Sequence, residues 1–220
     1  MDEYNLREVE FFGKITAGIT HELKNVLAVI KETSGLMGDI LDMKGAQEFQ
    51  GKERFIKAIS TIQRQVENGD TLLTRLNKFA HSPDKENAES DLHNVIQELF
   101  ALCDRYIRQK NITVNVQHPE NVVKFTANPV SLQLVLFSCL NYCILSLPQQ
   151  AQIDVTVQQD TGSEYVIRFN CSEKLSGTEA ISTGDEVENR LRKLHNTTDI
   201  INGKIEISLS TLLLKLHPQS

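Results

Sequence analysis

The sequence lacks an excess of basic residues, an apolar run of membrane-spanning length and any Cys-x-x-Cys pair. Its 23 basic and 29 acidic residues give a formal net charge of −6 over 220 residues, which argues against a nucleic-acid partner bound through a basic face. No uninterrupted apolar run approaches the roughly 20 residues of a membrane-spanning helix. The acidic start, MDEYNLREVE, is unlike a secretory signal. We therefore expect a cytoplasmic protein with no nucleic-acid and no membrane partner.

The four cysteines predict neither a disulfide framework nor a metal site. Cys103, Cys139 and Cys143 lie in apolar helical stretches, and Cys171 follows a strand-like run. Cys139 and Cys143 are one helical turn apart, but the spacing typical of zinc ligands does not occur. We interpret all four as buried free thiols in a reducing compartment, and we expect no metal.

The first half of the chain has the apolar period of long helices. An amphipathic helix is predicted from about Asn5 to Met43, and its apolar stripe comprises Phe12, Ile15, Ile19, Leu23, Val26, Ile30, Met37 and Leu41. After a polar loop with Gly45 and Gly51, a second stripe comprises Phe55, Ile59, Ile62, Val66, Leu72 or Leu73, Leu76 and Phe79, and Pro83 ends it. Residues 1–82 therefore predict a long antiparallel helical hairpin. Because such a hairpin leaves apolar surface uncovered, we expect a homodimer that completes a four-helix bundle.

The second half changes to mixed strands and helices after a polar linker at 81–90. Helices are predicted at about 91–110, 129–147 and 186–200, and strands at 112–117, 122–126, 153–158, 165–170, 204–208 and 212–216. Elements in this order predict a two-layer α/β sandwich over residues 91–220. The whole chain is therefore expected to be of the α+β class.

His21 points away from the apolar stripe of the first helix. At about 100° per residue, the stripe stays within about 60° of Phe12, whereas His21 lies at about 180°. A core histidine therefore fits poorly, although an incidental surface histidine remains an alternative. Glu22 follows directly, and Asn25 lies one turn further on. An exposed imidazole is a nucleophile near neutral pH, a carboxylate beside it can accept its proton, and a nearby amide can hold a water for attack on a phosphoryl group. These three residues therefore suit phosphoryl transfer.

The stretch FFGKITAGITHELKN, residues 11–25, resembles the phosphoacceptor box of two-component histidine kinases. The predicted hairpin is similar to their dimerisation and histidine-phosphotransfer domain. This resemblance implies that His21 is phosphorylated and that Glu22 serves as base in autophosphorylation. It also implies that Asn25 supports dephosphorylation of a partner response regulator.

The resemblance continues into the second half, where DLHNVIQEL (91–99), ANPVSLQLVL (127–136) and NGKIEI (202–207) resemble parts of the kinases' ATP-binding domain. The positions that hold nucleotide in that family depart from its pattern. Tyr142 stands where an asparagine helps to hold Mg²⁺, and Ser138 stands where a second asparagine often occurs. Cys171 replaces the aspartate that reads adenine, and Glu173 replaces a glycine. A later glycine-rich box is reduced to TGDEVEN at 183–189. We therefore expect a degenerate ATP-binding domain and no bound cofactor.

Together these features resemble phosphorelay histidine phosphotransferases whose kinase-like second domain no longer binds ATP. In this interpretation His21 carries a phosphoryl group between response-regulator receiver domains. One alternative is a non-catalytic pseudo-kinase that binds a receiver or promotes its dephosphorylation through Asn25. Another is a divergent ATP-dependent histidine kinase.

Overall fold

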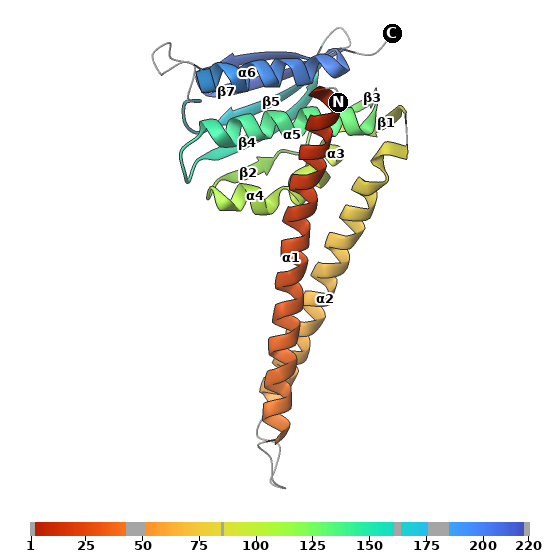
Figure 1. The fold of residues 1–220 in the computed structure, drawn as a ribbon, viewed down its shortest axis with the longest axis vertical. Coiled ribbons are helices and arrows are strands. Elements are labelled where there is room, and N and C mark those ends of the chain that lie inside the picture. The colour runs from red at the N-terminus through yellow and green to blue at the C-terminus, as the bar shows by residue number, and fades with distance from the viewer. Residues whose placement is uncertain (1–2, 43–51, 85, 161–163, 176–184, 218–220) are drawn as a thin grey trace. The chain divides into compact units, whose positions relative to one another are not determined.

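The computed structural model describes residues 3–42, 52–84, 86–160, 164–175 and 185–217 (Figure 1). The chain forms two compact units, one of residues 14–80 and the other of residues 1–13 together with 81–220. The first unit is helical and the second contains both helices and strands. The predicted α+β class, with long N-terminal helices followed by a sheet domain, is confirmed.

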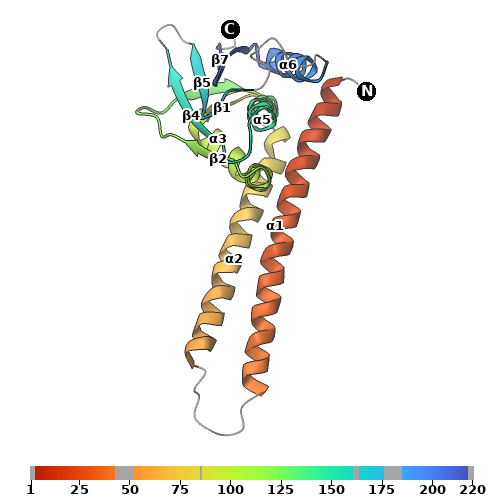
Figure 2. The same cartoon turned by 90° about the vertical axis from the view of Figure 1, so that its left-hand side faces the viewer.

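The helical unit is a hairpin of two long helices. Helix α1 spans Glu3–Asp42 and α2 spans Lys52–Ala80, and α2 runs back alongside α1 in both ribbon views (Figures 1 and 2). The two helices approach closely at Gly69, where an added Cβ would lie 3.4 Å from Cγ1 of Val26. The predicted loop with Gly45 and Gly51 lies outside the described residues.

Burial within the two long helices differs from the predicted stripes in detail. Ile15 and Ile19 are buried, as predicted, but Ile59 and Val66 are 38% and 55% exposed. Ala58 is 5% exposed and takes the buried position next to Ile59. The reason is angular, because one residue is a step of 100° around a helix and the predicted stripe was wider than the buried face.

In the part of the chain that the structure describes, the sandwich unit contains seven strands and the remaining helices. Its elements are η1 (Ser82–Asp84), β1 (Ala88–Asp91), α3 (Leu92–Leu102), α4 (Asp104–Gln109), β2 (Thr113–Val116), β3 (Lys124–Ala127), α5 (Pro129–Ser146), β4 (Gln152–Gln159), β5 (Tyr165–Cys171), α6 (Asp185–Thr198), η2 (Asp199–Ile201), β6 (Lys204–Ser208) and β7 (Thr211–Leu216). The strands β1 and β3 form an antiparallel pair, and the other five form a sheet of order β2-β4-β5-β7-β6. Only β2 and β4 in that sheet run parallel.

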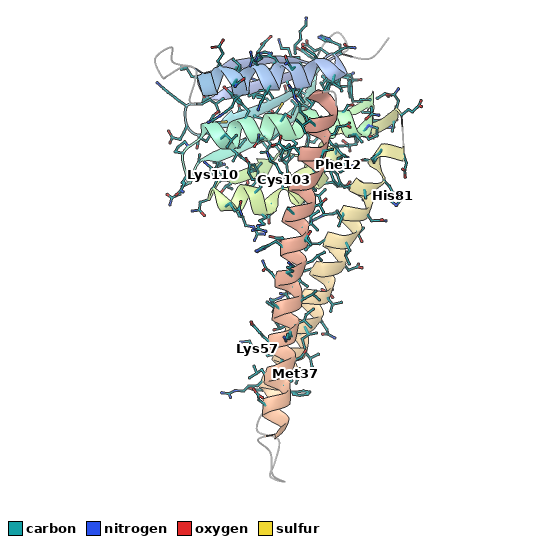
Figure 3. The ribbon with its side chains drawn as sticks, in the orientation of Figure 1. Phe12, Met37, Lys57, His81, Cys103 and Lys110 are labelled. Carbon is teal, nitrogen blue, oxygen red and sulfur yellow. The ribbon has the colours of Figure 1, made fainter. Side chains whose placement is uncertain are left out.

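Two predicted elements are wrong in this unit. The supposed linker at 81–90 contains η1 and most of β1, because β1 pairs with β3 from Ala88 opposite Ala127 to Asp91 opposite Lys124. The predicted helix at 91–110 is two helices that meet at Cys103 (Figure 3), whose ψ of −2° departs from the helical value. The sequence of β1, AESD, does not alternate apolar and polar residues, so periodicity does not predict a strand there. The segment is a strand because it pairs with β3.

Helix α5 is the central element of the sandwich. It begins after Asn128, whose side chain accepts a hydrogen bond from the Ser131 N–H at 3.0 Å, and 13 of its 18 residues are buried. It is long and apolar enough to cross a membrane by composition, but 72% of that stretch is buried inside the protein. Figure 2 shows α5 and α6 on the same side of the five-stranded sheet. Helix α5 is therefore a core helix of the sandwich.

The first turns of α1 belong to the sandwich unit. Phe11 is 1% exposed, and its ring centroid lies 5.0 Å from that of Phe137 on α5. Nη1 of Arg7 donates to Oγ1 of Thr197 at 2.9 Å and to the Lys193 carbonyl at 3.2 Å. These contacts group residues 1–13 with 81–220, whereas the sequence placed them with the hairpin.

We expect Phe11→Ala to lower the free energy of unfolding by about 3–5 kcal/mol, because it removes a buried ring from the face of α5. Phe12→Ala is the matched control, since the neighbouring ring is only half-buried, and its cost should be clearly smaller. Urea denaturation followed by circular dichroism measures both. Equal losses in the two variants would contradict the assigned packing.

Candidate functional site

Helix α1 carries the three residues that the sequence singled out. His21 and Asn25 are exposed, and Glu22 is half-buried. Nδ2 of Asn25 lies 3.4 Å from Nδ1 of His21, so the amide one turn along the helix is within hydrogen-bonding distance of the ring. The structure therefore brings His21 and Asn25 together on one exposed face of the helix.

Small side chains flank His21 on this face. Ala17 and Ala28 are both exposed, and by helical geometry both lie within about 40° of His21. Small side chains one and two turns from His21 thus lie on the same exposed face as the imidazole.

The contact between His21 and Asn25 bears on which ring nitrogen can react. If the amide nitrogen of Asn25 donates to Nδ1, the neutral ring carries its proton on Nε2. If the amide is rotated by half a turn, its oxygen accepts a proton from Nδ1, and Nε2 then has the lone pair. Rotation of the Asn25 amide therefore selects the tautomer, and the second tautomer has a nucleophilic Nε2 at the outer end of the ring.

The α5 residues that match the kinases' two asparagines do not present polar groups for a ligand. Tyr142 is 5% exposed, and its side chain is hydrogen-bonded to that of Ser146. Burial raises the pKa of the Tyr142 phenol above its ordinary value. The Ser138 hydroxyl donates to the Leu134 carbonyl at 2.8 Å, within its own helix. Both side chains are thus engaged with α5 itself.

The segment after β5 also differs from a phosphate-binding loop. Cys171 ends the strand at 8% exposure, and Leu175 is 1% exposed, with its N–H bonded to the Leu209 carbonyl at 2.7 Å. Glu173 between them is exposed. An apolar side chain therefore fills the space under this segment. The predicted remnant of the glycine-rich box at 183–189 lies partly outside the described residues.

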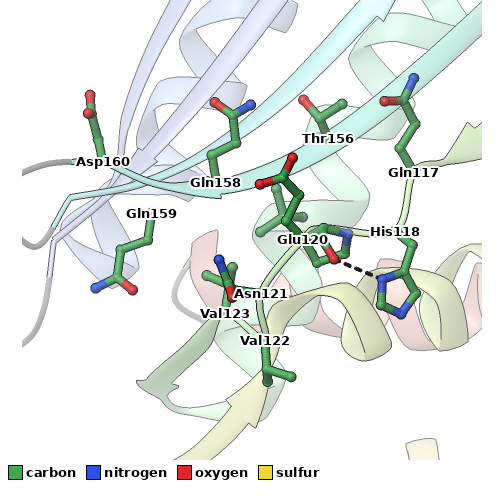
Figure 4. A pocket seen from close by; sticks show the side chains of 12 residues that line it. Gln117, His118, Glu120, Asn121, Val122, Val123, Thr156, Gln158, Gln159 and Asp160 are labelled. Atoms are coloured by element: carbon green, nitrogen blue, oxygen red, sulfur yellow. Dashed lines mark hydrogen bonds between the residues drawn. The ribbon is translucent and has the colours of Figure 1, made fainter.

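A hollow of about 740 Å³ lies elsewhere in the sandwich unit, between β4 and the segment that joins β2 to β3 (Figure 4). It is lined by residues 117–123 and 156–160. Neither His21 nor the positions matched to nucleotide binding take part in it. Within the described ranges, His, Cys, Asp and Glu side chains form no group of three or more that could hold a metal ion.

Comparison with known proteins gives one related sequence and a set of similar structures. No family model matches the chain. Sporulation kinase A of Bacillus subtilis is 23% identical over 154 residues, which cover 70% of this chain but 24% of that protein. The chain thus spans about a quarter of the length of this relative.

Two solved histidine kinases illustrate the structural likeness. The histidine kinase AdeS of Acinetobacter baumannii is 13% identical with a TM-score of 0.47, over 91% of this chain and 98% of that one. The histidine kinase ThkA, solved in complex with the response regulator protein TrrA, is 15% identical with a TM-score of 0.45, over 96% of this chain and 63% of that one. Over 70% of its length this chain is therefore similar in sequence to part of a sporulation kinase.

Proposed function

We propose that this chain is a histidine phosphotransferase of a two-component phosphorelay. In this proposal, His21 carries a phosphoryl group between response-regulator receiver domains without binding ATP. The observation that carries the proposal is the exposed His21 ring, with the Asn25 amide 3.4 Å from its Nδ1 and Glu22 next to it in the chain. The similarity to a sporulation kinase supports the two-component setting.

The proposed transfer is a direct displacement at phosphorus. Nε2 of His21 attacks the phosphoryl group held on a receiver's aspartate, the N–P bond forms, and the P–O bond to the carboxylate breaks. The carboxylate leaves with the bonding electron pair. The attack leaves the ring positively charged with a proton on Nδ1. The Asn25 oxygen can accept a hydrogen bond from this proton, and transfer of the proton to the Glu22 carboxylate makes the ring neutral again. The reverse displacement loads a second receiver.

Two features of the sandwich support the part of this proposal in which the chain does not bind ATP. Tyr142 stands at the position where histidine kinases place an asparagine for Mg²⁺. Its phenol is buried and hydrogen-bonded to the Ser146 side chain. The buried Leu175 and exposed Glu173 occupy the segment where those kinases need glycines, and a carboxylate there would repel phosphates. These residues do not fit a magnesium nucleotide.

His21→Ala should abolish transfer of label from a phosphorylated receiver domain to this chain, because no other residue in the proposed step supplies the nucleophile. His81→Ala is the matched control, since it removes another exposed histidine and should leave transfer unchanged. Gel autoradiography, with the acid-lability expected of phosphohistidine, measures the label. Label that persists in His21→Ala would contradict the assignment.

The same assay separates the relay from the alternative of a regulatory module. Asn25→Ala should keep at least part of the label on His21, whereas it should lower any release of free phosphate from the receiver, because the amide that would hold the attacking water is gone. Free phosphate with no label on the wild-type chain would favour the module that promotes dephosphorylation.

We expect no saturable binding of MgATP to the wild-type chain and no label on His21 from ATP and Mg²⁺ alone. Isothermal titration calorimetry and incubation with γ-labelled ATP measure these two outcomes, with an active histidine kinase as the positive control. Binding or self-labelling would favour the divergent ATP-dependent kinase.

The homodimer is also part of this proposal, and exposed apolar residues on α2 support it. Ile59, Val66 and Leu73 are 38%, 55% and 52% exposed and recur every seven residues. A seven-residue period keeps these side chains on one side of the helix, within about 40°. A second copy of the hairpin would cover the same stripe on both protomers in a four-helix bundle.

Val66→Asp should shift the chain from dimer to monomer, because it places a charge in the apolar stripe of α2. Asn68→Asp adds the same charge about 160° away around the helix and should leave the dimer intact. Sedimentation equilibrium of both variants and the wild type measures the masses. A wild-type monomer, or equal dissociation of both variants, would contradict this interface.

A further inference from the structure

Two cysteine thiols meet between α5 and the sheet. Cys143 on α5 and Cys171 at the end of β5 are joined by a side-chain hydrogen bond. Along β5 the core-facing residues alternate as Ile167, Phe169 and Cys171, so the Cys171 thiol lies on the side of the sheet that α5 covers. The sequence predicts both as buried free thiols, and 27 residues lie between them in the chain.

The backbone at Cys171 is held in place on both sides. Its N–H donates to the Ser210 carbonyl at 2.7 Å, and the next N–H, of Ser172, donates to the Gln152 carbonyl at 2.8 Å. Ser172 in turn accepts the Gln152 N–H on its hydroxyl at 2.9 Å. Cys143 is fixed in the middle of a buried helix. The two sulfur atoms are therefore neighbours through rigid elements.

The two thiols differ in exposure and in acidity. Cys171 is 8% exposed at the rim of the core, whereas Cys143 is 0% exposed. The hydrogen bond from Cys143 lowers the pKa of Cys171 below its ordinary value. The same hydrogen bond, followed by burial, raises the pKa of Cys143 well above its ordinary value. Cys171 is thus the thiol that forms a thiolate and that a small oxidant reaches first.

We propose that Cys143 and Cys171 form a redox-active dithiol site, in which Cys171 reacts first with hydrogen peroxide and Cys143 then closes an intramolecular disulfide. In the first step the Cys171 sulfur attacks one peroxide oxygen, the S–O bond forms, the O–O bond breaks, and the leaving hydroxide takes a proton to become water. In the second step the Cys143 sulfur attacks Cys171, the S–S bond forms, and the S–O bond breaks with loss of water. Two thiols and one peroxide thus give one disulfide and two waters.

The other two cysteines provide internal comparisons. Cys103 is 2% exposed and burial raises its pKa to about 12. Cys139 is 0% exposed one turn before Cys143, and burial raises its pKa as well. We therefore expect the full chain to lose the free thiols of Cys143 and Cys171 together on mild oxidation. The Cys103 thiol should stay reduced.

The full chain, treated with hydrogen peroxide and digested without reductant, should give one linked peptide pair, Cys143 with Cys171, that dithiothreitol separates. Cys143→Ser should leave Cys171 as a sulfenic acid that dimedone labels, and Cys171→Ser should prevent the linkage. Cys103→Ser is the matched control and should form the same disulfide as the wild type.

A measurement on the unaltered protein keeps the test independent of how the variants fold. N-ethylmaleimide should modify Cys171 at least about tenfold faster than Cys103. Equal rates for these two thiols, or peroxide products that are only sulfinic acids or links between chains, would overturn the proposal. A linkage that persists in Cys171→Ser would also overturn it.

Discussion

The sandwich unit depends on one constraint, namely that α5 is mostly apolar and that 13 of its 18 residues are buried. The sheet covers one face, α3 and α6 lie against others, and Phe11 near the start of α1 packs on Phe137. Each of these elements contributes apolar residues that would otherwise be exposed, so their positions follow from the burial of a single helix. A polar contact at the capping residue Asn128 defines where the helix begins.

This packing bears directly on the chemistry of the second half. A helix that serves a nucleotide must keep polar side chains on the face toward the ligand, whereas α5 buries Tyr142 and engages Ser138 with its own backbone. The polar chemistry of the chain is concentrated instead on α1, where His21 and Asn25 are exposed. The buried core and the proposed reactive residues therefore lie on different helices.

Local periodicity was sufficient to predict most elements, and 100° per residue was sufficient to place His21 on the exposed face of its helix. Periodicity placed Phe12 in the apolar stripe, but Phe11 is the buried ring and Phe12 is only half-buried. The difference depends on contact of Phe11 with Phe137, far along the chain. It also missed polar β1, which becomes a strand only by pairing with β3. The meeting of Cys143 with Cys171 is likewise long-range and leaves no trace in local sequence. What the sequence could not supply was thus, in each case, a partner distant in the chain.

The sandwich unit is discontinuous in sequence, since residues 1–13 join 81–220. A fragment that starts at residue 81 would lack Arg7 and Phe11 and would expose the surfaces of Phe137 and Thr197 that they cover. During synthesis the opening turns of α1 leave the ribosome before the rest of this unit, and Thr197 follows 190 residues later than Arg7. Completion of this unit must therefore wait until nearly all of these residues have been translated, and until then α1 has an apolar end that a chaperone could hold.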